Sequence, residues 1–306
     1  MNNGGILNFK QVEIEDYSRI YPYTSAYGEG SCQHSPVSMY SLSEKYMDEV
    51  CIRNDVLYTL RSALCDDVYR VYLSPLTGGS MREAFAEVLQ DAASYGKKVQ
   101  FLSLTKKASD ILSKEFPEEF DITEDRNLAE YIYRTEVMAG FLGHSLTKRR
   151  QQVRRFMRDF GERTSITKIT GEDAESILRF EHYWIEKYGE SHDVEALKRE
   201  ERMIIKQFAH FDELRLSGIV LRIDEKVYGF GYGTKLNDEY YDAIVEKGDY
   251  SIPNIYKVLR RESVRLCAMD SRYVNMEEDV GIEGLRNIKL SYHPEYLLRK
   301  YIAKQK

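Results

Sequence analysis

Residues 218–245 read GIVLRIDEKVYGFGYGTKLNDEYYDAIV, and this stretch decides the fold of the second half of the chain. It holds three runs rich in β-branched and aromatic residues, at 218–223, 226–234 and 240–245. The tripeptide DEK between the first two runs is short enough for a tight reverse turn, which is typical of an antiparallel meander. The segment GFGYG (Gly229–Gly233) lies inside a strand and opens no helix, so its glycines predict a close backbone approach or a bulge and only weakly suggest a dinucleotide loop.

Elements on both sides of this meander predict a mixed sheet with helices on its faces. They are, in chain order, the strand SITKIT, helices at 171–188 and 194–211, the meander, a helix near 253–269, a strand at 272–276, a helix at 282–290 and the tail PEYLLRKYIA. The order β-αα-βββ-α-β-α-β is typical of an α+β domain and differs from the regular alternation of a doubly wound fold.

The first half of the chain also alternates strands and helices. We expect strands at 56–60, 68–73, 99–104 and 131–137, and helices at 80–95, 106–116 and 144–160. Residues 161–170 look like the boundary between two domains, which we expect at 1–160 and 161–306. The last helix of the first domain is rich in basic residues. A length of 306 residues fits two domains.

Composition restricts the class of protein. The chain is 42% hydrophobic and 31% charged, with a net charge of −6 and 24 tyrosines, which is a folding composition. No apolar run approaches the roughly 20 residues of a membrane-spanning helix, and the first residues show no signal-peptide pattern. The four cysteines form no CxxC pair, so we expect free thiols and a cytoplasmic protein. The six histidines lack ligand spacing, and no metal site is predicted.

The helix at 144–160 concentrates positive charge. Up to position 158 it holds six basic residues and no acidic one, and without those six the chain would have 38 basic and 50 acidic residues, a net charge of −12. Five apolar residues share an arc of about 100° and predict one packed face: Leu146, Val153, Phe156, Met157 and Phe160. Candidate anion-binding residues on the helix are Lys148, Arg149, Arg150, Arg154, Arg155 and Arg158. They suit a tRNA stem, a nucleotide or anionic lipid headgroups, but a solvated face paired with acidic residues explains them equally well.

Two further groups carry candidate chemistry. Glu246 closes the third strand of the meander, where it could act as a general base or anchor a neighbouring arginine. In the stretch 274–297, carboxylates could hold a substrate amine and cations a carboxylate or phosphate, although helix capping and surface pairing are the alternative. The candidates in this stretch are Asp279, Glu283, Arg286, Lys289, Tyr292 and His293.

The block VNMEEDVGIEGLRNIKLSYHPEYLLRKY (274–301) resembles the C-terminal domain of phosphatidylglycerol lysyltransferase. Further matching pieces are ITEDRNLAEYIY, the basic helix ending in RRF, the GIVLRIDEKVYGFGYG hairpin and DAIVEKGD. The similarity covers roughly residues 7–303. It implies two tandem GNAT-like domains, each with a mixed, mostly antiparallel sheet flanked by helices, and it makes PEYLLRKYIA the last strand of the second domain.

The same resemblance implies transfer of an aminoacyl group from a charged tRNA to an amine or hydroxyl. On this reading Glu246, Asp279 and Glu283 are catalytic, and the cations listed above, with Tyr292 and His293, bind substrate. No cofactor is bound, and aminoacyl-tRNA or acyl-CoA is the co-substrate. The basic helix would contact tRNA or an anionic lipid headgroup, although relatives tend to show Asn-His where this chain has Gln151 and Gln152.

Two alternatives remain open. An acyl-CoA-dependent N-acyltransferase would carry a glycine-rich [QR]xxGx[GA] loop before the helix near Pro253, where its backbone N–H groups would hold the pyrophosphate. This chain has KGDYSIPN there, with one glycine and a proline that removes a donor. The second alternative is a non-catalytic module that binds tRNA or another anionic ligand through the basic helix.

Overall fold

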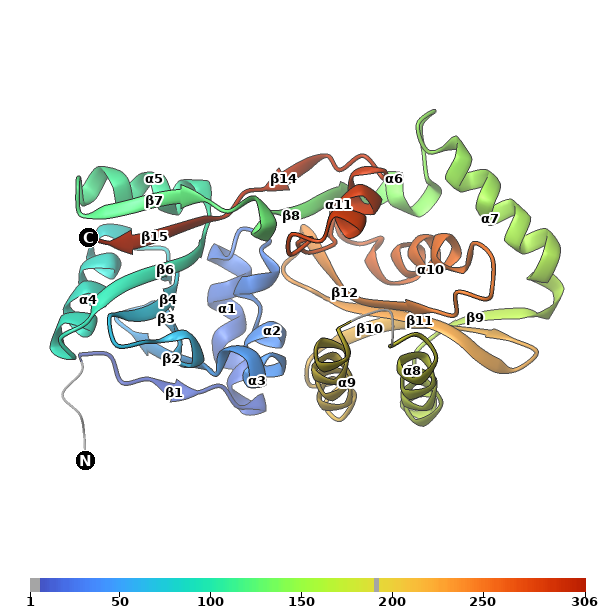
Figure 1. Ribbon diagram of the computed structural model, residues 1–306, viewed down its shortest axis with the longest axis horizontal. Helices are drawn as coiled ribbons and strands as arrows, with labels where there is room; N and C mark the ends of the chain where they lie inside the picture. The colour runs from blue at the N-terminus through green and yellow to red at the C-terminus, as the bar shows by residue number, and fades with distance from the viewer. Residues whose placement is uncertain (1–5, 190–192) are drawn as a thin grey trace. The chain divides into compact units, whose positions relative to one another are not determined.

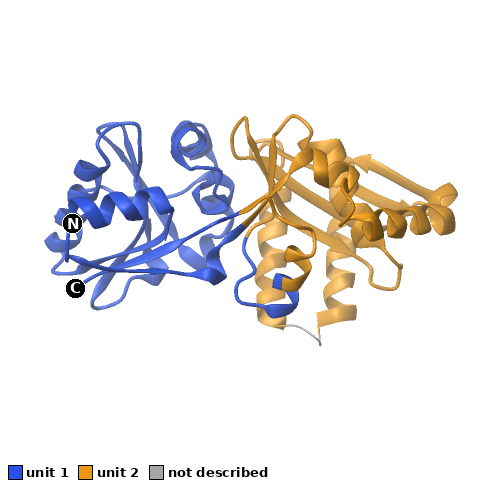
Figure 2. Ribbon diagram, turned by 90° about the horizontal axis from the view of Figure 1, so that it is seen from above, with its two compact units in different colours: residues 1–130, 278–286, 297–306 blue, residues 131–277, 287–296 orange. Residues whose placement is uncertain are grey.

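The computed structural model describes residues 6–189 and 193–306, which form two compact units (Figures 1 and 2). Unit 1 comprises Met1–Glu130, Glu278–Arg286 and Leu297–Lys306, and unit 2 comprises Tyr131–Glu277 and Asn287–Tyr296. This division differs from the single boundary expected between residues 160 and 161. The chain leaves unit 1 at residue 130 and returns to it twice, so the basic helix belongs to unit 2.

The described part of unit 2 is built on a seven-stranded mixed sheet. Its strands in spatial order are β14 (Tyr296–Leu298), β8 (Glu130–Arg134), β13 (Tyr273–Asn275), β12 (Tyr240–Gly248), β11 (Lys226–Lys235), β10 (Leu216–Ile223) and β9 (Thr164–Lys168). The meander β10–β11–β12 is antiparallel, as predicted. Asp224 and Glu225 form its first turn with φ of 48° and 63°, the left-handed conformation that tight hairpin turns require. β13 is parallel to β12, and β8 is antiparallel to β13.

The glycines of GFGYG allow two strands to approach closely. The register between β11 and β12 shifts at Tyr232/Gly233, which confirms the predicted bulge. A Cβ on Gly233 would lie 1.8 Å from the backbone oxygen of Asp242 on β12, a distance that no side chain can adopt. Glycine is therefore required here by the neighbouring backbone.

Helices lie on both faces of the unit 2 sheet (Figure 1). α8 and α9 are on one face and α10 is on the other, with α7 packed against α10. The helices of this unit are α6 (Thr135–Gly140), α7 (Thr147–Phe160), α8 (Ala174–Tyr188), α9 (Val194–Phe208), α10 (Ile255–Ser263) and α11 (Glu283–Leu290). α10 continues as a π-helical turn at Val264–Ala268, and the first residues of α11 belong to unit 1. The expected strand at 131–137 is shorter than predicted, because the chain turns into α6 at Thr135.

The described part of unit 1 contains an eight-stranded sheet. Its strands are β1 (Lys10–Gln11), β2 (Asp48–Arg53), β3 (Val56–Arg61), β4 (Tyr69–Leu73), β6 (Lys98–Leu104), β15 (Tyr301–Gln305) and β7 (Phe120–Glu124), with β5 (Leu76–Thr77) paired to β3. Its helices are α1 (Tyr17–Tyr27), α2 (Pro36–Ser41), α3 (Ser43–Tyr46), α4 (Met81–Ser94) and α5 (Lys106–Glu115). α4 and α5 bury Phe85, Val88 and Leu112 against the sheet, and the predicted cap Ser80 accepts a hydrogen bond from Glu83 N at the start of α4. The α+β prediction, two mixed and mostly antiparallel sheets flanked by helices, is confirmed.

The tail PEYLLRKYIA does not form one last strand of the second domain. It divides into β14, at an edge of the unit 2 sheet, and β15, which inserts between β6 and β7 in unit 1. Ala303 of β15 is fully buried there, opposite Phe101 and Ile122. The tail therefore completes the core of unit 1, through contacts with strands that lie about 200 positions earlier in the chain.

In the part of the chain that the structure describes, no helix combines the length and the apolar character needed to cross a bilayer.

Candidate functional site

Several candidate residues meet on one side of the unit 2 sheet, in a group that we call the cationic cluster: Arg149, Glu246, Lys257, Arg260 and Tyr292. Glu246 on β12 accepts a hydrogen bond from Arg260 of α10, with Nη2 2.9 Å from Oε1. The guanidinium groups of Arg260 and Arg149 lie 4.6 and 4.9 Å from the centre of the Tyr292 ring. The cluster thus joins β12, α7, α10 and the segment after α11 around one aromatic ring.

Electrostatics inside the cationic cluster are unbalanced, because three cations surround one carboxylate. Burial lowers the pKa of Lys257, and the charges of Arg149 and Arg260 lower it further. Burial by itself would lower the pKa of Arg260, but the negative charge of Glu246 raises it, and the net effect is a raised pKa. Burial also raises the pKa of Tyr292. The one carboxylate is already shared with Arg260, so an added anion would be attracted to this place.

The exposed face of α7 carries the remaining cations. Val153 and Phe156 are buried as predicted, but Met157 is 42% exposed, so the packed arc is narrower than expected. Lys148, Arg154 and Arg155 are exposed. Among the described residues, none of these three forms an ion pair.

Arg149 and Arg150, by contrast, are engaged within unit 2. Arg149 donates to Ser291 Oγ (2.9 Å), which fixes its guanidinium beside Tyr292. Arg150 donates to the backbone oxygens of Phe141 and Gly143, so it holds the loop before α7. Arg158 pairs with its neighbour Asp159.

The carboxylate of Asp279 is buried in a structural network of unit 1. It accepts hydrogen bonds from Arg286 (2.8 and 2.9 Å) and from Arg126 (3.2 Å), and its Oδ1 also caps Gly281 N. Arg286 donates to Asn127 as well. Two guanidinium groups and a backbone N–H already engage this carboxylate, so the geometry favours helix capping and ion pairing over recognition of a substrate amine.

The other residues proposed from the stretch 274–297 have separate surroundings. Lys289 lies in unit 2 and donates to the backbone oxygen of Met276 (2.6 Å). Glu283 and His293 are both exposed. Glu283 lies in the first turn of α11, and His293 lies three positions after the last residue of that helix. Of the thirteen residues proposed as catalytic or substrate-binding, the structure therefore brings Glu246, Arg149 and Tyr292 together.

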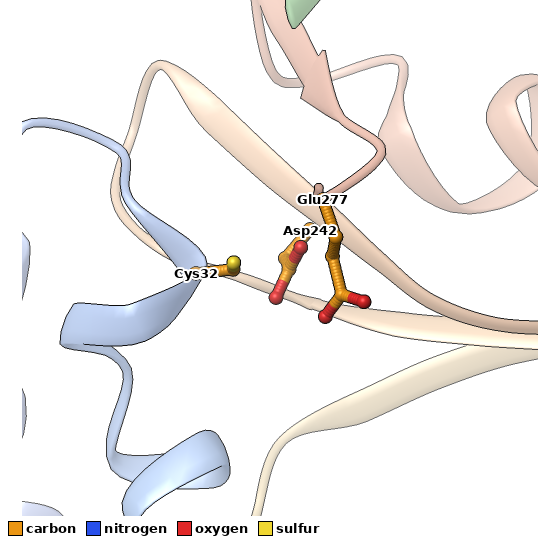
Figure 3. A group of neighbouring side chains, drawn as sticks. All are labelled: Cys32, Asp242 and Glu277. Carbon is orange, nitrogen blue, oxygen red and sulfur yellow. The ribbon is translucent and has the colours of Figure 1, made fainter. Parts of the chain in front are cut away.

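Two carboxylates that the sequence reasoning left out of the site lie close together in unit 2. Asp242 on β12 is fully buried, and its register partner on β13 is Asn275. Figure 3 shows the side chains of Asp242 and Glu277 next to each other, with carboxylate oxygens within 4.8 Å. Two carboxylates leave most ligand positions of a Mg²⁺ or Ca²⁺ ion unfilled, so this pair does not by itself form a metal centre.

Sequence reasoning also missed Arg260 and Lys257, the two cations that α10 adds to the cluster. The two positions are three apart, so they share a helix face, and this was the signal available. The spacing alone does not identify what this helix face contacts. The fold shows that it packs against β12 and α7, which are distant in the sequence.

Comparison with known proteins gives a family and a set of related folds. The family model described as "Phosphatidylglycerol lysyltransferase, C-terminal" matches residues 25–304. The crystal structure of a conserved protein of unknown function from Bacteroides thetaiotaomicron VPI-5482 is 28% identical, covers 98% of this chain and 100% of its own, and has a TM-score of 0.92. The L-PGS structure from Bacillus licheniformis is 13% identical over 97% of this chain and 93% of its own, with a TM-score of 0.66, which shows a similar fold.

A curated relative, an uncharacterized protein of Mycoplasmoides gallisepticum, is 24% identical over 177 residues. The match spans 57% of this chain and 55% of that relative, so this chain covers about half of the relative's length. The resemblance first seen in the block at 274–301 is thus confirmed by a match over most of the chain.

Proposed function

This chain belongs to the family of phosphatidylglycerol lysyltransferase C-terminal domains, and from that premise we propose that it is an aminoacyltransferase. The donor we propose is an aminoacyl-tRNA, and the acceptor is an amine or a hydroxyl group. The observation that carries the proposal is the cationic cluster, a half-buried set of three cations around one carboxylate beside Tyr292. Its excess positive charge suits a phosphate of the nucleic-acid donor.

In the proposed reaction, the acceptor nitrogen or oxygen attacks the carbonyl carbon of the aminoacyl ester. A new C–N or C–O bond forms, and the bond between the carbonyl carbon and the ribose oxygen breaks. Glu246 takes the proton from the nucleophile and returns it to the ribose oxygen, which leaves as a hydroxyl group. Arg260 holds the Glu246 carboxylate in position through its hydrogen bond, while Arg149 and Lys257 attract the donor phosphate.

Glu246→Gln tests the base. We expect kcat to fall by about 100-fold or more with a small change in KM, because general bases contribute at least that much. The assay measures loss of the aminoacyl group from bulk aminoacyl-tRNA, with a panel of small amines and phosphatidylglycerol vesicles as acceptors. Glu239→Gln serves as the control, because it changes a carboxylate that is 60% exposed and lies just before β12. A rise in KM with kcat and the pH profile unchanged would show that Glu246 only orients Arg260.

The exposed cations of α7 give a second prediction. Changing Lys148, Arg154 and Arg155 together to alanine should reduce the slope of log K against log salt for tRNA binding by about two to three, since each phosphate contact contributes about 0.9. Arg150 is unsuitable for this test because it holds the loop before α7. Binding is measured by fluorescence anisotropy at several salt concentrations, with anionic and neutral vesicles as a second arm. An unchanged slope would exclude this face as the tRNA surface, and loss of vesicle binding alone would assign it to lipid.

The link between β12 and α10 favours the aminoacyl-tRNA donor over acyl-CoA. Asp249 lies in this link and accepts hydrogen bonds from Ser251 N (2.8 Å) and from Tyr188 (2.6 Å). Burial would raise the pKa of Asp249, but its hydrogen bonds to Ser251, Tyr188 and Lys187 hold that pKa at about 2. An ionised carboxylate repels a pyrophosphate, and this one also occupies a backbone N–H that a pyrophosphate would need. The link is therefore poorly suited to bind the pyrophosphate of acyl-CoA.

A further inference from the structure

Unit 1 contains a cavity that none of the candidate residues described above lines. It lies between the end of α1, the segment before α2, β5 and the start of α5, and its volume is about 90 Å³. A dry engineered cavity of about 150 Å³ holds benzene, so this one has room for a molecule of a few non-hydrogen atoms. Its walls are mostly apolar and include Leu76, Met81 and Ala108.

The buried side of this cavity carries His34. The residue is only 2% exposed, and among the described residues neither of its ring nitrogens has a hydrogen-bond partner of ordinary geometry. Burial and the charge of Lys300 together lower its pKa to about 3, although Glu130 and the nearby Gly28 backbone act in the opposite direction. The imidazole is therefore neutral and offers one donor and one acceptor. A buried polar ring of this kind is costly unless a ligand or water pairs with it.

Opposite charges stand at the mouth of the cavity. Lys107 is exposed in the first turn of α5, a ten-residue helix whose N-terminus adds partial positive charge. Glu29, also exposed, lies on another segment of the lining. Among residues 6–189 and 193–306, neither Lys107 nor Glu29 forms an ion pair. The mouth can therefore bind a carboxylate at one point and an ammonium group at another.

We propose that this cavity binds a small neutral α-amino acid. The carboxylate contacts Lys107 and the N-terminus of α5, the ammonium group contacts Glu29, and a short side chain enters the cavity toward His34. Alanine fits the apolar walls, and serine adds a hydroxyl that pairs with the imidazole. The site lies wholly within unit 1 and does not depend on the proposed transferase activity, so each can fail without the other.

Isothermal titration calorimetry on the full chain tests the site, with alanine, serine, propionate and ethylamine as ligands. We expect alanine and serine to bind with a dissociation constant on the order of 1 mM, and propionate and ethylamine to bind more weakly because each lacks one of the two charges. Lys107→Met should weaken binding by about 10-fold or more. Lys114→Met, an exposed lysine near the other end of the same helix, should leave binding unchanged.

A second measurement needs no variant in the buried part of the site. Serine should shift the imidazole NMR signals of His34 in the unmodified protein, and ethylamine should not. The proposal is overturned if no amino acid binds at millimolar concentration, if Lys107→Met binds as well as the unmodified chain, or if the His34 signals stay in place when serine binds. Propionate binding as tightly as alanine would also overturn it, because Glu29 would then recognise nothing.

Discussion

Replacing Lys300 by methionine should lower the free energy of unfolding by about 3–5 kcal/mol, the largest stability effect expected for this protein. Lys300 and Glu130 are both fully buried in unit 1, with Nζ 2.8 Å from Oε1. Ser31 and the backbone N–H of Cys32 also donate to the Glu130 carboxylate. Without the lysine, the buried Glu130 carboxylate would lose the cation that is paired with it, and the neutral donors Ser31 and Cys32 N–H would not compensate its charge.

Urea denaturation followed by circular dichroism measures this effect. Lys304→Met changes an exposed lysine on β15, the strand that directly follows Lys300. It is the matched control and should change the free energy of unfolding by less than about 0.5 kcal/mol. The double change Lys300→Met with Glu130→Gln should recover much of the loss, because it removes the unpaired charge. A single Lys300→Met variant within about 1 kcal/mol of the unmodified chain would show that the buried pair does not hold β15 in unit 1.

Arg260→Met should reduce aminoacyl transfer by about 100-fold or more, the largest expected effect on activity. Removing one preorganised donor from an active site commonly costs about that factor. Arg260 contacts both Glu246 and the Tyr292 ring, so its loss frees the proposed base and lowers the positive charge of the cationic cluster. Transfer is measured with the bulk aminoacyl-tRNA assay described above.

A spectroscopic readout separates this role from general damage to the fold. Arg260 is one of the two cations that lower the pKa of Lys257, so that pKa should rise in Arg260→Met and stay low in Arg260→Lys. NMR titration of the lysine side chains follows the change. Arg265→Met is the control, since Arg265 is 54% exposed and pairs with Glu262 away from the cluster. Full activity in Arg260→Met would remove the cationic cluster from the proposed mechanism.

Local patterns in the sequence were sufficient to place most secondary structure. The meander, the bulge at Gly233 and the cap at Ser80 depend on neighbouring residues, and each was found where expected. The candidate site was predicted less completely. Glu246 was identified with its alternative role as an arginine anchor, and the structure supplies that arginine as Arg260. Asp279 and Arg286 were expected to bind substrate, but they pair with each other within unit 1.

The sequence by itself determined the element order, the α+β class, the family and the amphipathic character of α7. Each of these follows from residue type and spacing within a short window, or from a match along the chain. The tertiary structure alone decided that β15 returns to unit 1, that α7 belongs to unit 2, and that Arg149 and Lys257 share one cluster with Glu246. Such contacts join segments far apart in the chain, and they form only when burial of many side chains together favours one arrangement of the strands.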